Sequence, residues 1–288
     1  LEFDILDVSV PGYYKEYATS WESISKLLMS YNDFGNTLIG APYLNNVIKS
    51  LESTKLTGEE LLRKAYESVK SVVKWDEKSS LYTSNVSLGF VYKMKIGNSA
   101  DINLILYQLL KKLNFDVELV MMSTRENGIL SPISPSMQKL NYVIVQAYIG
   151  TKSYLLDATD TYCPYYLLPF RCLNGTGRTV DANRSQQVDL VPKAKEQEQT
   201  TYNLTLQDDF SLKGDLSIKR IDYSALNFRH DYHKFNSTEE FLEDYRKDKP
   251  GLVINESSID NIDSIYLPSE EHYKITVNNQ LNIIGDEI

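Results

Sequence analysis

The hydrophobic pattern in the middle of the chain changes from a helical period to a strand period, and this change constrains the fold most. From residue 98 to 113, leucine and isoleucine recur at helical spacing on nearly every side, which predicts a buried helix. Asn98 is a good N-cap, and Asp101 occupies the reciprocal position of a capping box. Segments 117–122, 142–149 and 153–157 then read as strands, the last two forming a hairpin around Gly150-Thr151. The sequence therefore predicts an α+β fold.

Similar patterns divide the rest of the chain. Helical spacing recurs at 21–28, 59–73 and 238–246, and strands are predicted at 1–10, 202–206, 212–221 and 273–277. Residues 163–180 are rich in Pro, Gly and Tyr and are interpreted as an ordered loop, and the polar segment 192–200 is the best domain boundary. We expect three parts: a strand at 1–19 that remains from an upstream β domain, a core at 20–192, and a smaller β-rich α+β domain at 193–288.

Composition excludes several classes of function. The net charge of −9 argues against a nucleic-acid partner, because phosphate binding needs a basic face. No apolar run approaches the roughly 18 residues of a membrane span. The chain begins at Leu1 with no signal-like stretch, which we interpret as a mature form or an excised fragment. The sequence does not decide whether Cys163 and Cys172 form a disulfide. Without a Gly-rich phosphate loop, Cys-x-x-Cys or His-x-x-x-His, no cofactor or metal is predicted.

Three short segments carry a resemblance. The buried helix begins with Gly97-Asn98-Ser99-Ala100-Asp101. The first strand begins with Leu140-Asn141-Tyr142-Val143-Ile144-Val145, and the next strand ends with Tyr154-Leu155-Leu156-Asp157. This order resembles the transglutaminase-like core of the papain fold, where the helix begins with Gly-x-Cys-x-Asp, the first strand carries a His and the second ends in an Asp. With segments 123–125 and 168–175, the chain resembles the bacterial branch in which such a core lies between β-rich domains of unknown function. The resemblance covers residues 20 to 190 best.

The resemblance places Ser99 at the cysteine, Tyr142 at the histidine and Asp157 at the aspartate. In that family the helix N-terminus favours the thiolate, the histidine moves its proton and the aspartate orients the ring. A serine is far less acidic, and a tyrosine of pKa about 10 is a neutral phenol near pH 7. The resemblance therefore implies an inactive relative. The alternative is a hydrolase or acyl-transferase that uses Ser99 with another base.

Other polar groups have two interpretations each. Asp157 is either a surviving acid or a strand-end carboxylate that accepts backbone N–H groups or the Tyr142 hydroxyl. Cys163 is either a displaced nucleophile or an inert loop thiol. The histidines, His230, His233 and His272, all follow the domain boundary and are interpreted as solvated imidazoles.

The old cleft is expected to be lined by Asn98, Tyr162, Tyr165 and Tyr166. Together with Phe170, the tyrosines form either a platform for a ligand or the edge of a core. A tyrosine is longer than a histidine, so Tyr142 should narrow the cleft, and its hydroxyl should donate to Asp157 or Ser99.

The resemblance alone implies a binding or scaffolding role at the bacterial cell envelope, in a periplasmic or exported protein. Its partner stays open among a protein, a peptide and a glycan.

Overall fold

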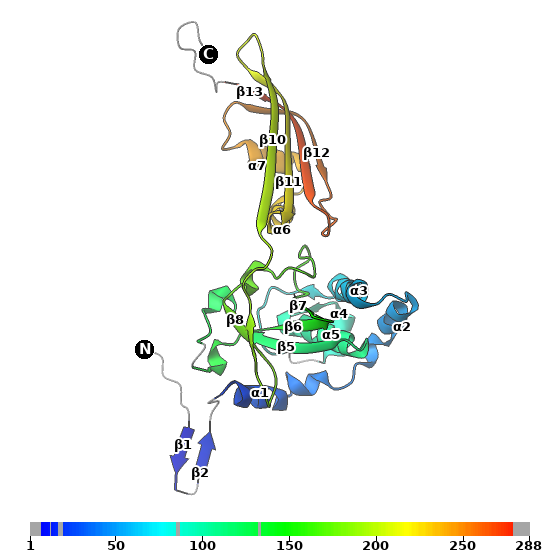
Figure 1. The fold of residues 1–288 in the computed structure, drawn as a ribbon, viewed down its shortest axis with the longest axis vertical. Coiled ribbons are helices and arrows are strands. Elements are labelled where there is room, and N and C mark those ends of the chain that lie inside the picture. The colour runs from blue at the N-terminus through cyan, green and yellow to red at the C-terminus, as the bar shows by residue number, and fades with distance from the viewer. Residues whose placement is uncertain (1–6, 12, 17–19, 85–86, 132–133, 279–288) are drawn as a thin grey trace. The chain divides into compact units, whose positions relative to one another are not determined.

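The chain has an α+β fold (Figure 1). The computed structural model describes residues 7–11, 13–16, 20–84, 87–131 and 134–278. Contacts divide the chain into two compact units, Leu1–Pro192 and Lys193–Ile288. The division falls at the start of the polar segment found in the sequence.

The first unit is built around a five-stranded antiparallel sheet of order β7-β6-β5-β8-β9. Its strands are β5 (Asp116–Met122), β6 (Tyr142–Ile149), β7 (Lys152–Leu156), β8 (Thr176–Thr179) and β9 (Gln187–Asp189). In this register Met122 lies opposite Tyr142, and Val145 lies opposite Leu156. The segment predicted as a loop, 163–180, thus contains strand β8, and a 3-10 turn at Phe170–Cys172 as well.

Helix α5 (Ser99–Lys112) is the centre of this unit. It packs against β5 and β6 on one side and against α3 (Gly58–Val72) on another. Leu104, Ile105 and Leu106 are consecutive and fully buried, which explains why the apolar pattern covers nearly every side of the helix. The predicted buried helix and its contact with antiparallel strands are confirmed.

The remaining helices of the first unit are α1 (Trp21–Ser30), α2 (Asn45–Ser53) and α4 (Leu88–Met94). Helix α1 begins with a reciprocal cap between Ser20 and Ser23. The sequence predicted α1 and α3 within two residues at each end. It did not predict α2 or α4, which are short and bury few side chains.

A short parallel pair places Trp75 beside the start of α5. Strand β3 (Lys74–Trp75) pairs with β4 (Ile96–Gly97), so that Trp75 lies opposite Gly97. A Cβ at position 97 would lie 2.6 Å from a Val91 methyl group and 2.9 Å from the Asp101 Cβ. Glycine is therefore required where this strand enters the helix.

The N-terminal strand expected at 1–10 is one arm of a hairpin. Strand β1 (Asp7–Val10) pairs antiparallel with β2 (Tyr13–Glu16). The parts of that expectation at 1–6 and 17–19 lie outside the described residues.

The second unit is a four-stranded antiparallel sheet of order β10-β11-β13-β12 with two helices. Its elements are β10 (Glu196–Leu206), β11 (Leu212–Asp222), α6 (Tyr223–Tyr232), α7 (Thr238–Arg246), β12 (Leu252–Asp260) and β13 (Ser269–Val277). The core is formed by Leu216, Ile218, Tyr273 and Ile275, with Leu242 of α7 packed against it. Strand β10 already begins at Glu196, so the polar segment is a connection only up to residue 195.

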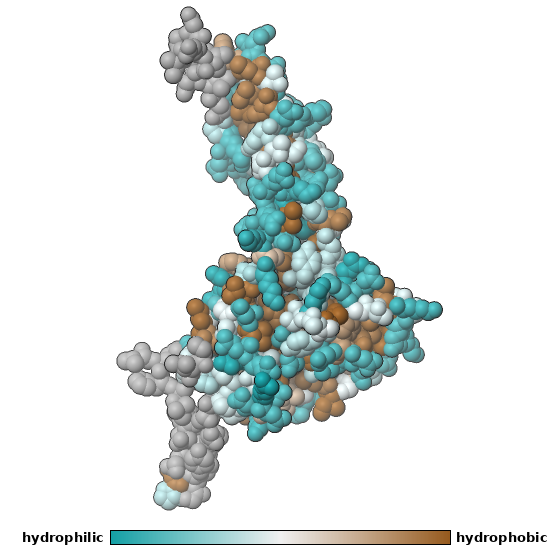
Figure 2. Space-filling view, viewed as in Figure 1, coloured by the Kyte–Doolittle hydropathy of each residue, from teal (hydrophilic) through white to brown (hydrophobic). Residues whose placement is uncertain are grey.

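The surface of both units mixes polar and apolar residues. On the visible face of the first unit, brown apolar groups are separated by teal polar ones (Figure 2). Single exposed hydrophobic residues, such as Phe170 and Ile129, are ordinary on a protein surface.

Candidate functional site around Ser99, Tyr142 and Asp157

Helix α5 begins at the position predicted for the nucleophile. Ser99 is the first residue of the helix, and the side-chain oxygen of Asn98 accepts a hydrogen bond from the Asp101 N–H at 2.9 Å. The Asp101 carboxylate accepts from the Asn98 N–H at 3.0 Å in return. This is the predicted capping box. The prediction that Ser99 lies at the start of a buried helix is confirmed.

The hydroxyl of Ser99 is buried and bonded to one backbone segment. Its oxygen accepts a hydrogen bond from the Ser80 N–H at 2.8 Å, and its proton is donated to the Ser80 carbonyl at 3.1 Å. The Ser99 N–H donates to the Lys78 carbonyl at 3.1 Å. A serine hydroxyl has one proton. In this arrangement Ser99 therefore has no proton to give to a base.

Residues 78–84, which we call the covering segment, are held on the start of α5 by further bonds. The Ser84 N–H donates to Asp101 Oδ1 at 3.0 Å, and Asn98 Nδ2 donates to the Tyr82 carbonyl at 3.0 Å. Burial raises the pKa of Asp101, although the hydrogen bonds from Asn98 and Ser84 lower it. The segment thus lies over the place where a substrate would meet a nucleophile.

Tyr142 and Asp157 lie on adjacent antiparallel strands, as predicted. Tyr142 is the first residue of β6, and Asp157 directly follows β7. Both side chains are fully buried, and the Tyr142 hydroxyl donates to Asp157 Oδ2 at 3.0 Å. The predicted bond is confirmed. The alternative, a tyrosine hydroxyl in a solvent-filled cleft, is wrong.

Asp157 is the acceptor at the centre of a dense network. Its Oδ1 accepts from the side-chain amide of Asn103 at 3.0 Å and from the Thr159 N–H and hydroxyl at 3.2 and 2.8 Å. Its Oδ2 accepts from Tyr142, from the Cys172 thiol at 3.3 Å and from the Arg171 guanidinium at 3.4 Å. Both oxygens are fully used by protein donors, which satisfies a buried carboxylate. The strand-end interpretation of Asp157 is the one that these bonds support.

Arg171 supplies the positive charge of the site. Its Nε donates to the Tyr142 hydroxyl at 3.1 Å, and its terminal nitrogen also bonds to the Thr159 hydroxyl. The guanidinium stacks on the Trp75 ring at 4.2 Å from the ring centroid. Burial lowers the pKa of Arg171, but the charge of Asp157 together with the interactions with Tyr142 and Cys172 raises it by more, so the net change is upward. A permanent cation therefore neutralises the buried carboxylate.

The phenol at the histidine position stays protonated. Burial raises the pKa of Tyr142 well above its ordinary value, and the negative charge of Asp157 raises it further. The same two causes raise the pKa of the Cys172 thiol. Neither group is a base or a thiolate near neutral pH.

Sequence reasoning missed three residues of this site. Asn103 lies one helical turn after Ser99 and is a fully buried amide in an otherwise apolar stretch of α5. A polar residue within an apolar stretch is a sequence signal that could have identified it. Arg171 is the only charged residue of segment 168–175, which was recognised only as a family pattern. Trp75 gives no signal in the sequence, because only the β3–β4 pairing brings it to Arg171.

The four residues expected to line the cleft have separate roles. Asn98 is a helix cap. Tyr165 is buried and donates to Glu59 of α3 at 2.6 Å, its ring lying edge-on to Tyr166, which is 43% exposed. Tyr162 is partly buried, and its N–H donates to Asp160 at 3.0 Å. Tyr165 thus belongs to a core edge.

Both cysteines are buried free thiols. Burial raises the pKa of Cys163 well above its ordinary value, and the charge of Asp160 raises it further. The Cys163 carbonyl accepts a hydrogen bond from Lys70 at 2.6 Å. These properties favour the interpretation of Cys163 as an inert thiol.

The histidines belong to the second unit. His233 lies 3.3 Å from Asp263, and His272 lies 3.6 Å from Asp260. His230 is exposed. Each is at least partly open to solvent, in agreement with the surface interpretation.

The described ranges contain neither a candidate membrane span nor a candidate metal site. No helix there combines the length and the apolar character needed to cross a bilayer. In the same part of the chain, no group of three or more His, Cys, Asp or Glu residues is placed to hold a metal ion.

Comparisons with known proteins give a distant structural similarity. No protein-family model matches the sequence, and no curated protein matches it. The chain is similar to the crystal structure of a "putative protease" from Parabacteroides distasonis, with 9% sequence identity and a TM-score of 0.42. That similarity covers 92% of this chain, which spans 54% of the other. Membership of the transglutaminase-like family stays a prediction.

Proposed function

We propose that this chain is a non-catalytic, transglutaminase-like protein that acts by binding at the bacterial cell envelope. The observation that carries the proposal is the Ser99 hydroxyl, which both accepts from and donates to the backbone of Ser80. A nucleophile needs its proton to lie toward a base. Here that proton lies toward a carbonyl, which cannot take it.

The absence of a base at the histidine position supports the same conclusion. The Tyr142 hydroxyl donates to Asp157 and accepts from Arg171, and its pKa is raised chiefly by burial. General base catalysis needs a group whose pKa lies near the working pH. The polar groups of the old reaction centre have become a structural hydrogen-bond network.

The competing function is a hydrolase or acyl-transferase that uses Ser99. It requires two rearrangements: Ser99 must leave Ser80, and a base must replace Tyr142. Lys70 has a pKa lowered by burial, but it donates to the Cys163 carbonyl and, in the described part of the chain, forms no hydrogen bond with Ser99. The non-catalytic role needs neither change.

The test is an assay of the purified chain for peptide hydrolysis and for exchange of glutamine amides with a fluorescent amine. We expect the wild type, Ser99→Ala and the exposed control Ser79→Ala to give equal background signals. Turnover that disappears in Ser99→Ala and survives in Ser79→Ala and Cys163→Ala would establish the competing function.

The envelope location rests on the resemblance alone and has its own test. We expect the full-length protein to fractionate with the periplasm or the envelope of its bacterial host. Recovery with the cytoplasmic enzymes would contradict this part of the proposal.

A further inference from the structure

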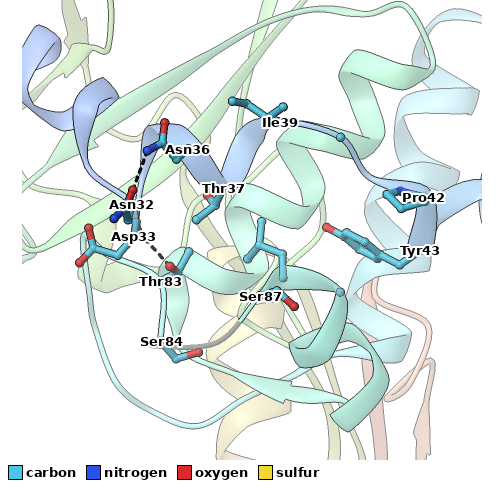
Figure 3. Close-up of a pocket in the computed structure, with 13 residues that line it drawn as sticks. Asn32, Asp33, Asn36, Thr37, Ile39, Pro42, Tyr43, Thr83, Ser84 and Ser87 are labelled. Atoms are coloured by element: carbon cyan, nitrogen blue, oxygen red, sulfur yellow. Dashed lines mark hydrogen bonds between the residues drawn. The ribbon is translucent and has the colours of Figure 1, made fainter.

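A pocket with a polar end and an apolar end lies on the first unit, between the segment after α1 and the start of α4. Its volume is about 720 Å³, within the roughly 300–1,000 Å³ of small-molecule sites. Figure 3 shows Asn32, Asp33 and Asn36 at one end and Pro42 and Tyr43 at the other. None of the triad positions lines it.

The polar end presents hydrogen-bonding groups in a fixed arrangement. Asn36 Nδ2 donates to Asn32 Oδ1 at 2.7 Å, which orients both amides. The Asn32 NH₂ group and the Asn36 oxygen are then left as a neighbouring donor and acceptor. The Asp33 carboxylate adds two acceptor oxygens and has no ion pair among the described residues. The Asp33 backbone is anchored, because its carbonyl accepts from the Thr83 N–H and hydroxyl at 2.8 and 3.0 Å.

The apolar end is held in place by a buried side chain of α5. Gln108 donates to the carbonyls of Thr37 and Gly40 at 2.8 and 3.1 Å, and it accepts a hydrogen bond from the Tyr43 hydroxyl. One side of the Tyr43 ring lies against Gly89, where an added Cβ would be only 3.1 Å from the ring. The pocket wall is therefore pre-organised by the same helix that carries Ser99.

The charges of the pocket select against an anion. Asp33 is the only charged residue among those lining it, so a negative group would meet an uncompensated carboxylate. The polar end can exchange hydrogen bonds with hydroxyl groups, and the aromatic and aliphatic end can contact C–H groups. Such a pocket suits a ligand that has hydroxyl groups on its edges and C–H groups on its faces. A neutral sugar has this distribution of groups.

A second cavity of about 380 Å³ adjoins the pocket and shares Asn36, Ile39 and Gly40 with it. A ligand longer than one sugar can therefore continue past the Ile39 ridge. Lys111 and Lys112 line that second cavity, and Asp33 does not. We propose that the pocket binds one residue of a neutral oligosaccharide, which the second cavity extends. This proposal rests on the proposed function only in treating the chain as a binding protein.

The test is a titration followed by amide chemical shifts, using the neutral probes maltotriose, cellotriose, mannotriose and N,N′,N″-triacetylchitotriose. We expect at least one of them to shift amides within 32–43 and 83–89. Asp33→Ala combined with Asn36→Ala should weaken its binding by about tenfold or more, because hydrogen bonds are lost at both groups. The matched control, Asp116→Asn combined with Asn46→Ala, changes exposed residues outside the pocket and should bind like the wild type.

Four outcomes overturn the proposal. The first is that no probe shifts the amides of the pocket, and the second is that the pocket variant and the control variant bind the probe equally well. The third is that the protein binds a uronic acid trisaccharide and none of the neutral probes. The fourth is that it binds a neutral tripeptide and none of the sugars. Turnover through Ser99 would instead refute the proposed function and leave the titration unaffected, so the two failures are distinguishable.

Discussion

At the scale of single residues, Asp157 shows what a fully buried carboxylate needs from its neighbours. A buried carboxylate is costly unless every lone pair has a donor and a cation lies nearby. Tyr142, Thr159, Asn103 and Arg171 meet both needs. Each of these side chains is therefore required for stability, because removing one would leave buried polar partners unsatisfied.

Tyr142→Phe isolates this requirement. The variant keeps the ring and removes the hydroxyl, so that Arg171 Nε loses its acceptor and Asp157 loses a donor. We expect a loss of about 1–3 kcal/mol in the free energy of unfolding, measured by urea denaturation. Tyr148→Phe on the same strand is the control. Its hydroxyl bonds to Glu118 in a half-exposed setting, so it should cost less than about 1 kcal/mol. Equal losses in the two variants would contradict the special role of the network.

The sequence predicted part of this site. The Tyr142–Asp157 bond was predicted from the resemblance, which places the two residues at the histidine and aspartate positions, and from the need of buried polar groups for partners. Arg171 and Trp75 meet only because a turn after β7 and the β3–β4 pair converge in space. Such contacts depend on tertiary packing, which the hydrophobic period does not encode.

At the scale of elements, the start of α5 and the covering segment form one unit of structure. Bonds from Ser80 and Ser84 reach the first turn of the helix, where a capped N-terminus would otherwise activate a thiol. While the covering segment lies on the first turn of α5, the side chain of residue 99 cannot act as a nucleophile. The position of this segment therefore decides whether residue 99 is reachable.

Ser99→Cys tests that conclusion. We expect the new thiol to react with iodoacetamide as slowly as Cys163, because residues 99 and 163 are both fully buried in the native chain. Mass spectrometry of peptides after timed labelling gives the rate at each position. Unfolded protein should label equally at all three cysteines, which serves as the control. Faster native labelling at position 99 would mean that the covering segment opens.

Elements with a strong period were predictable, and those without one were not. Helix α7 was predicted with its observed ends, because Ser237 caps it and Phe241 and Leu242 lie on one face. Helix α6 was missed, since it buries Arg229 along with its apolar residues and shows no clean stripe. Strand β10 is longer than predicted, because nearly all its side chains are exposed and the alternation disappears.

At the scale of the whole molecule, the unusual tyrosine content connects composition with stability. The chain has 21 tyrosines, and several are buried with a hydroxyl bonded to another side chain. A buried phenol is stable only while it is protonated, because burial penalises the phenolate. Tyrosine burial should therefore limit the pH range of the native state from above.

We expect the native state to lose stability as the pH rises above about 10, the ordinary pKa of tyrosine in an unfolded chain. Burial raises the pKa of Tyr82 to about 12, and it raises those of Tyr43 and Tyr142 as well. Above pH 10 the unfolded state has therefore lost protons that the folded state retains, so the free energy of unfolding falls with pH. Lys70 has the opposite effect on the free energy of unfolding, because burial lowers its pKa. It is a single group, whereas several tyrosines are buried. Tyrosinate absorbance at 295 nm should rise in two steps, exposed residues first and buried ones only with loss of the near-ultraviolet circular dichroism. A single step near pH 10 with the dichroism intact would show that the buried phenols ionise in the native state.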